Sequence, residues 1–129
     1  MNLQFEASEH YQKALKQGRK SHRESVHQGQ YPYLRALDDF LEDSLVAGQV
    51  DLGVIEIPMD MIVGTKTAGR TNSFSSDFMP LLNEHSEFGW KWRKLCEAHL
   101  GEEGIRDPIR CYEYLGRLYV QEGNKRVSV

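Results

Sequence analysis

The sequence predicts an α+β fold, in which two helices within residues 1–49 precede a region of strands and helices at residues 50–129. Three observations support this class. Residues 6–28 are polar and contain no proline and a single glycine, as expected for a helix. At residue 50 the composition changes to β-branched and aliphatic residues, which favour strands. Near the C-terminus, two short apolar runs flank a glycine in the manner of a hairpin.

Composition and charge limit the class of protein. The chain has 129 residues, room for one core, and its 40% hydrophobic and 27% charged residues are ordinary for a globular domain. A net charge of −3 argues against a general polycation for nucleic acid. No stretch resembles a signal peptide or a membrane span, so we expect a cytoplasmic protein with no membrane partner. Cys96 and Cys111 lack metal or CxxC spacing, and we expect two reduced core thiols.

The N-terminal region predicts two helices. The first runs from Glu6 to about Gln28, and four basic residues share one of its faces: Lys13, Lys16, Lys20 and Arg23. Such a face can contact phosphates, but a solvated helix face is the commoner explanation and the one we favour. Pro32 is placed to open a second helix, which Gly48 would end. Its apolar stripe consists of Leu34, Leu37, Leu41 and Leu45.

The second region predicts strands around one helix. A strand is expected over Leu52–Ile57, followed by a loop at residues 65–77. A helix is expected over Glu87–Leu100, with Ser86 as its N-cap and Gly101 as its terminator. A strand over Ile109–Leu115 should return as Leu118–Gln121 through a type II′ turn at Gly116-Arg117.

The end of the last strand has the features of an anion site. Gly123 lets the backbone turn sharply and lets a ligand approach it closely. The first N–H groups of a following helix would have no internal partners, and Lys125 and Arg126 add two positive charges beside them. Glu122 precedes the glycine, where a carboxylate can hold magnesium or act as a base. The pattern therefore predicts a phosphate site at this junction.

Two segments in order resemble the ParB/sulfiredoxin-like family: Gly104-Ile105-Arg106-Asp107-Pro108-Ile109, and Gly123-Asn124-Lys125-Arg126 in the place of a Gly-x-x-Arg signature. The resemblance covers about residues 50–129 and leaves residues 1–49 as a helical extension. It implies a small mixed sheet with packed helices. It also implies an arginine-bearing loop after the first strand, for which Arg70 is the candidate.

The signature separates the branches of this family. Sulfiredoxins carry a cysteine where this chain has Asn124, so we reject that activity. ParB clamps, which bind cytidine triphosphate, carry a glutamate there that assists hydrolysis, so efficient hydrolysis by that route is not expected. The free-serine kinases carry an acidic residue directly before the glycine, and Glu122 resembles it.

The resemblance implies a nucleotide triphosphate or diphosphate with magnesium as the ligand. The phosphates would be held by Gly123, Asn124, Lys125 and Arg126. Arg70 and Arg106 would close over them from the loops, and Glu122 would position magnesium or a substrate hydroxyl as the candidate catalytic residue. Base identity would depend on the loops.

Two functions follow as hypotheses. The first is a ParB-like nucleotide-binding domain of a larger regulatory or DNA-associated protein. The alternative is a nucleotide-dependent enzyme domain, a kinase or a phosphohydrolase or nuclease, that uses Glu122 and the Gly123–Arg126 site. Because the sequence stops in the first turn of its last helix, we expect the natural chain to continue. DNA binding would use that further region, and a homodimer is left open.

Overall fold

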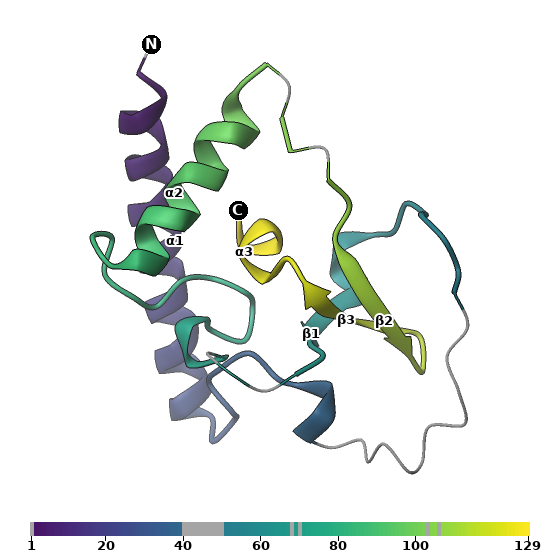
Figure 1. Ribbon diagram of the computed structural model, residues 1–129. Helices are drawn as coiled ribbons and strands as arrows, with labels where there is room; N and C mark the ends of the chain where they lie inside the picture. The colour runs from purple at the N-terminus through teal and green to yellow at the C-terminus, as the bar shows by residue number, and fades with distance from the viewer. Residues whose placement is uncertain (1, 40–50, 68, 70, 103, 106) are drawn as a thin grey trace.

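The computed structural model describes residues 2–39, 51–67, 69, 71–102, 104–105 and 107–129. Within these residues it contains three α-helices, α1 (Leu3–His27), α2 (Glu87–Leu100) and α3 (Asn124–Ser128), and three strands, β1 (Ile62–Thr65), β2 (Arg110–Tyr114) and β3 (Arg117–Glu122). The predicted α+β class is confirmed. The long helices α1 and α2 lie side by side, the sheet lies apart from them, and α3 lies between α2 and the sheet (Figure 1). None of the helices in the described ranges is both long and apolar enough to cross a membrane.

The sheet is mixed, with β3 in the centre. β3 pairs in parallel with β1 and antiparallel with β2. The backbone of residues 35–38 runs along the outer edge of β1: the Thr65 N–H donates to the Arg35 carbonyl at 2.8 Å, and the Asp38 N–H donates to the Lys66 carbonyl at 3.0 Å. This edge of the sheet is therefore covered by the chain that follows α1.

Two apolar clusters form the core. The sheet cluster comprises Leu34, Ile62, Phe74, Phe78, Leu118 and Val120. The helix cluster lies between α1 and α2 and comprises Ala7, Tyr11, Leu15, Trp92 and Cys96. Phe88 packs against both clusters, while Val127 packs on the first and Val129 on the second. α3 is thus held by packing on both sides, which a helix this short requires.

Helix α1 covers the range that the sequence predicts. Its surface is largely polar, and it packs on α2 through one narrow face. Ala7, Tyr11, Leu15 and Gly18 are buried along that face. A Cβ at Gly18 would lie 2.2 Å from the Pro80 carbonyl oxygen, so this position admits no side chain without a shift of the backbone. Phe5 and Val26, two further apolar residues of this helix, are exposed.

Helix α2 agrees with the prediction at both ends. The Ser86 hydroxyl accepts a hydrogen bond from the Gly89 N–H at 3.0 Å, and Gly101 is the C-cap. The side-chain cap satisfies one of the N–H groups that the first turn leaves without an internal partner.

The predicted second helix is absent where the structure describes this segment. Ala36 forms a bridge with Thr65 instead, and Leu37–Asp39 is a single 3₁₀ turn. The apolar residues of this segment are buried without forming a helical stripe, Leu34 and Ala36 ahead of the 3₁₀ turn and Leu37 within it. Residues 40–50, which hold the remaining leucines of the stripe, lie outside the described residues.

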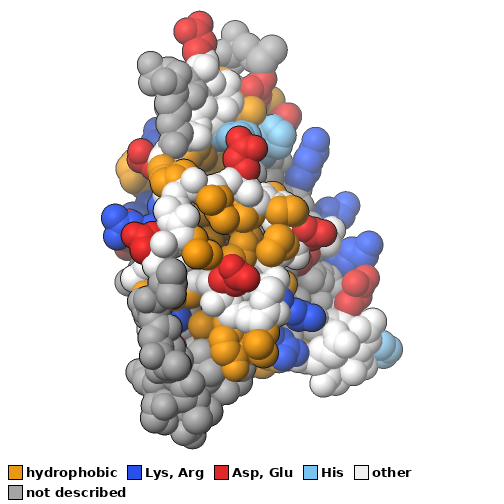
Figure 2. Space-filling model, turned by 90° about the vertical axis from the view of Figure 1, so that its right-hand side faces the viewer, with side chains coloured by type: hydrophobic (Ala, Val, Ile, Leu, Met, Phe, Trp, Pro, Cys, Tyr) orange, Lys and Arg blue, Asp and Glu red, His pale blue; other side chains and the backbone are white. Residues whose placement is uncertain are grey.

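The strand predicted at Leu52–Ile57 is wrong, since the first strand of the sheet is Ile62–Thr65. Residues 51–57 form no ladder, and most of their aliphatic side chains are exposed: Leu52, Val54 and Ile55 are 59%, 83% and 61% exposed, while Ile57 packs against the sheet cluster. Hydrophobic side chains gather on the face shown in Figure 2, which is the side of the molecule where this segment lies. The prediction was wrong because it followed the strand propensity of these residues, whereas their side chains do not alternate between buried and exposed positions.

The hairpin forms, but its turn is displaced by one residue. Tyr114 pairs with Arg117, so the turn consists of Leu115 and Gly116 rather than Gly116 and Arg117. Both turn residues have positive φ, 51° and 78°, which is the pattern of a type I′ turn and not of the expected type II′. Leu115 is 84% exposed and adopts a backbone conformation that leucine disfavours.

Candidate functional site

A cleft of about 1150 Å³ lies between α2 and the β3–α3 junction and is also lined by Gly69, Ser73 and Phe74. The four phosphate-binding residues predicted at the junction, Gly123, Asn124, Lys125 and Arg126, line it, and so does Glu122, the predicted catalytic or magnesium residue. The structure therefore brings the motif together at the wall of one concave surface. Arg70 and Arg106 lie outside the described residues, although Gly69, next to Arg70, lines the cleft.

Gly123 fixes how the chain passes from β3 into α3. Its backbone has φ 119° and ψ 24°, a left-handed conformation that side chains disfavour. A Cβ at this position would lie 2.7 Å from Ile109 Cγ2 and 3.1 Å from the Arg126 guanidinium. The sharp turn predicted at this glycine is confirmed, while the close approach of a ligand stays a prediction, because Ile109 and Arg126 occupy the space where a Cβ would stand.

Arg126 is engaged with the backbone of the preceding loop. Its Nη1 donates to the carbonyl oxygens of Asp107 and Pro108 at 3.1 and 3.3 Å. The two segments that carry the family resemblance, Gly104–Ile109 and Gly123–Arg126, therefore contact each other. Part of the guanidinium holds α3 to this loop, so the side chain contributes structure as well as charge at the cleft.

Asn124 is tied to β1 rather than extended into solvent. Its Nδ2 donates to the Thr65 hydroxyl at 3.1 Å, and that hydroxyl donates to the Val120 carbonyl at 3.0 Å. Asn124 Oδ1 is buried and accepts no hydrogen bond from the described residues. A buried acceptor without a partner lowers the stability of the fold by about 1–3 kcal/mol. An acceptor of this kind is a sign that a residue is kept for a functional reason.

Helix α2 supplies a basic and aromatic wall that the sequence analysis did not assign to the site. Trp90, Lys91 and Lys94 line the cleft from successive turns, together with Phe88. Lys94 Nζ lies 5.6 Å from the centre of the Trp90 ring, and Lys125 Nζ lies 5.5 Å from the centre of the Phe88 ring, both within cation–π range. A tryptophan on the polar face of a predicted amphipathic helix was the signal available in the sequence.

Positive charge exceeds negative charge around the cleft. Its lining includes four basic side chains, Lys91, Lys94, Lys125 and Arg126, against the two carboxylates of Glu87 and Glu122. Lys91 pairs with Glu87 at 2.8 Å and Lys94 with Glu97 at 3.4 Å, on an exposed helix surface where such pairs are weak. An anionic ligand can therefore compete for these lysines.

Glu122 stands at the end of β3, exposed and opposite Arg110 in the ladder. It lines the cleft beside the Gly123–Arg126 motif. In the described part of the chain there is no group of three or more histidine, cysteine, aspartate or glutamate side chains that could hold a metal ion. Magnesium at this position would rely on ligand oxygens, which is usual where magnesium binds with phosphates.

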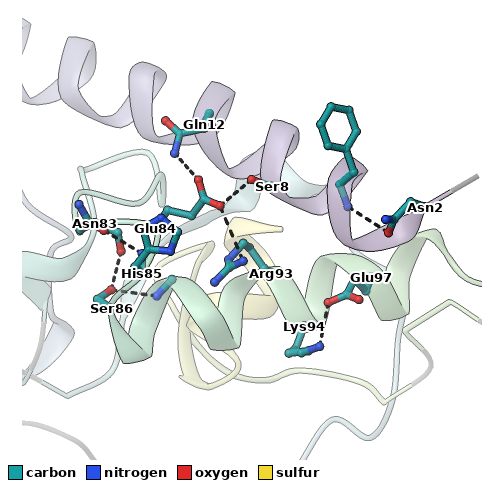
Figure 3. Close-up of polar contacts among 12 residues, drawn as sticks. Asn2, Ser8, Gln12, Asn83, Glu84, His85, Ser86, Arg93, Lys94 and Glu97 are labelled. Carbon is teal, nitrogen blue, oxygen red and sulfur yellow. Dashed lines mark hydrogen bonds and ion pairs between the residues drawn. The ribbon is translucent and has the colours of Figure 1, made fainter.

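A polar network, drawn in Figure 3, fixes the turn at residues 83–86, which reaches the rim of the cleft through Ser86. The Glu84 carboxylate accepts hydrogen bonds from Ser8, at 2.5 Å, and from Gln12, both on α1, and it lies 3.7 Å from the Arg93 guanidinium of α2. The hydrogen bond from Ser8 is the largest of the effects that hold the pKa of Glu84 below its ordinary value of 4.5. The network joins the rim to both long helices.

Tyr11 secures the same turn from the core of the helix cluster. Its buried phenol donates to the Leu82 carbonyl at 2.5 Å, and its ring meets Trp92 edge to face at 5.1 Å. Burial, followed by the charge of Glu84, raises the pKa of Tyr11 to about 12. The tyrosine is therefore neutral and a hydrogen-bond donor at physiological pH.

The two thiols take no part in the cleft. Cys96 is buried, Cys111 is half-buried, and both are unpaired. Burial raises the pKa of each thiol, which keeps it protonated and poorly nucleophilic. The basic stripe of α1 is also separate: Lys13, Lys16 and Lys20 are exposed and do not line the cleft.

The comparisons with known proteins give no relative for this chain. No protein-family model matches the sequence, and no curated protein or solved structure matches it. The assignment of function therefore depends on the geometry of the cleft.

Proposed function

We propose that this chain is a nucleotide-binding domain that holds the phosphates of a nucleoside diphosphate or triphosphate in the cleft between α2 and the β3–α3 junction. One observation carries the proposal. A single cleft of about 1150 Å³ is lined by the Gly123–Arg126 motif, by Lys91 and Lys94, and by the aromatic rings of α2. Basic groups suit phosphates, and an exposed aromatic ring suits a stacked base.

Trp90 is the candidate platform for the base. It is 51% exposed, and Lys94 lies over its ring. A ring that is already held on one side loses little conformational freedom when a base stacks on it. The volume of the cleft is somewhat above the range of about 300–1,000 Å³ typical of small-molecule sites, so a nucleotide fits within it.

Magnesium would be held by Glu122 together with phosphate oxygens, since one carboxylate and a phosphate chain are a common magnesium set. The metal would neutralise part of the phosphate charge. Gly123 and Lys125 would contact the phosphates from the wall of the cleft, and Arg126 would keep α3 in place beside them.

The ParB/sulfiredoxin-like fold stays part of the proposal. Its support is the order of elements at the site, a hairpin followed by a glycine turn and a helix, and the contact of Arg126 with the Asp107-Pro108 segment. A role in a larger regulatory or DNA-associated protein, in which bound nucleotide controls the partner, goes with that resemblance.

A second candidate is a phosphoryl-transferring or phosphate-hydrolysing enzyme. The observation that favours it is the position of Glu122, an exposed carboxylate on the wall of the same cleft. Phosphoryl transfer needs mainly positioning and charge stabilisation, and a carboxylate can orient the attacking hydroxyl. Release of phosphate from a nucleotide, lost in Glu122→Gln while nucleotide binding persists, would favour this candidate over binding alone.

A thermal-shift experiment tests the binding proposal. ATP, CTP, GTP and ADP with magnesium are compared with inorganic phosphate, because a ligand that binds only the folded state at about 100 times its Kd adds about 2.7 kcal/mol of stability. We expect at least one nucleotide to raise the melting temperature, and the Lys91→Ala/Lys94→Ala variant to lose most of that rise.

The matched control is Lys13→Ala/Lys16→Ala, which removes the same charge from α1 outside the cleft. It should keep the full nucleotide-dependent rise. An equal loss in both double variants would mean that the ligand responds to overall charge, and absence of any rise in the folded protein would contradict the proposal.

A further inference from the structure

We propose a second anion-binding site, separate from the cleft, that takes the phosphoryl group of a small organic phosphate between two arginines of α1. The site is a hollow of about 390 Å³, here called the arginine hollow, lined by Arg19, His22, Arg23, Tyr33, Asn72 and the leucine pair Leu81-Leu82. Its ligand is independent of the nucleotide proposed for the cleft, although Leu82 lines both spaces.

The spacing of the two arginines places them on the same face of α1. Arg19 and Arg23 stand one turn apart on α1 and line the same hollow, with His22 between them in sequence. Like charges at this spacing destabilise a helix by a few tenths of a kcal/mol, and a bound anion would relieve that repulsion. Of the four basic residues in the predicted stripe of α1, only Arg23 lines the hollow.

The cationic side chains of the hollow form no ion pair with the acidic residues that the structure describes. The ion pairs recorded among the described residues involve Lys66, Lys91, Arg93 and Lys94, and none involves Arg19, His22 or Arg23. An arginine fork matches the oxygens of a phosphate through two parallel hydrogen bonds, and two such forks suit a doubly charged group.

The opposite wall of the hollow is aromatic and fixed in place. The Tyr33 ring lies 5.2 Å from the His22 ring and 5.8 Å from the Tyr31 ring. The Tyr33 backbone pairs with Ser75 in an antiparallel bridge, and Asn72 lies on the 3₁₀ turn Thr71–Ser73. The walls come from four segments, α1, Tyr33, Asn72 and the leucine pair, and the Leu81 N–H also donates to the Ser73 carbonyl at 3.0 Å. The segments are already held together, so binding requires little ordering of the chain.

This combination points to an organic phosphate with an aromatic or other apolar body. The arginines would hold the phosphoryl group, Asn72 would supply an amide, and the body would lie against Tyr33 and the leucine pair. The hollow falls within the size range of small-molecule sites but is too small for an extended polymer.

Nuclear magnetic resonance of the ¹⁵N-labelled chain tests the proposal, with inorganic phosphate and phenyl phosphate as probes and sodium chloride at equal ionic strength as the blank. We expect saturable shifts at Arg19, His22, Arg23, Tyr33 and Asn72, with tighter binding of phenyl phosphate. Arg23→Ala should weaken binding about tenfold or more, because a hydrogen bond to a charged group is lost. Arg23→Lys should keep part of the affinity, since the charge remains without the fork.

Lys16→Ala is the matched control, because Lys16 is exposed on α1 and does not line the hollow. Asn72→Ala provides a second test outside the helix and should also weaken binding. Equal affinity in Arg23→Ala and Lys16→Ala, or shifts confined to residues 122–126 and α2, would overturn the proposal. Because the two sites report through different residues, failure of this site leaves the nucleotide proposal untouched, and the reverse also holds.

Discussion

Gly123 shows how a single residue sets the geometry of the cleft. Its left-handed backbone directs α3 toward the core, and the space where a Cβ would stand is taken by Ile109 and Arg126. The position thus combines a conformational demand with a steric one. Both demands act on the short helix whose residues line the cleft.

The consequence is a prediction for Gly123→Ala. A side chain at positive φ destabilises by more than about 1 kcal/mol, and the contact with Ile109 should add to that cost. Urea unfolding measures the free energy of unfolding. Gly29→Ala is the control, because Gly29 also has positive φ, 71°, but a Cβ there would meet nothing within 4 Å. If Gly123→Ala lowers the free energy of unfolding by less than Gly29→Ala does, the close approach at Gly123 does not contribute to stability.

Single residues also show which features of the site could be predicted from the sequence and which could not. The Gly123–Arg126 junction could be read from the sequence, because a glycine followed by basic residues has a local physical meaning. The bond from Arg126 to the Asp107 and Pro108 carbonyls could not, because it joins segments 18 or 19 residues apart through folding. Leu115 in the hairpin turn was missed because leucine is not a usual turn residue at positive φ.

At the scale of elements, the packing of α1 on α2 depends on buried polar groups as well as on the helix cluster. Glu84 is the centre of this contact: its side chain is 11% exposed and joins α1, α2 and the turn at the rim of the cleft. A depressed pKa means that the ionised carboxylate stabilises the folded state. That stabilisation is present above the ordinary pKa of 4.5 and is lost as the pH falls through the lowered value.

Glu84→Gln should therefore lower the free energy of unfolding at neutral pH by about 1–3 kcal/mol, the range for a hydrogen-bonded charge. The difference from the unsubstituted chain should shrink as the pH falls below 4.5 and through the lowered pKa of Glu84, because the carboxyl then becomes protonated in the folded chain as well. Denaturant unfolding at a series of pH values measures both effects. Glu9→Gln, an exposed change on α1, should stay within about 0.5 kcal/mol. A difference that does not change with pH would refute this role of the Glu84 charge.

Elements with strong local signals were predictable, and elements defined by distant partners were not. α2 has a cap, a stop and an apolar face in its own sequence, so its bounds could be stated in advance. The strand at Ile62–Thr65 exists because Gly64 lets the backbone approach both Arg35 and Tyr119, contacts that its sequence does not reveal. The more strand-like run before it remains unpaired.

At the scale of the whole molecule, the cleft lies beside the place where the sheet cluster and the helix cluster meet. Phe88, Val127 and Val129 connect the sheet cluster with the helix cluster, and the cleft opens beside this connection. The sequence predicted one wall, at the β3–α3 junction. The other wall, on α2, follows from packing: burying Trp92 and Cys96 against α1 leaves Trp90, Lys91 and Lys94 on the side that faces the junction.

The most direct measurement of the central proposal uses this division of the two tryptophans. Trp90 lines the cleft and is half-exposed, whereas Trp92 is buried and donates to the Ser128 hydroxyl at 2.8 Å. The chain holds no third tryptophan. We expect a nucleotide to quench the tryptophan fluorescence with a saturable dependence on concentration, and Trp90→Phe to abolish the change while Trp92→Phe keeps it. No saturable change, or an equal change in Trp90→Phe, would contradict nucleotide binding in this cleft.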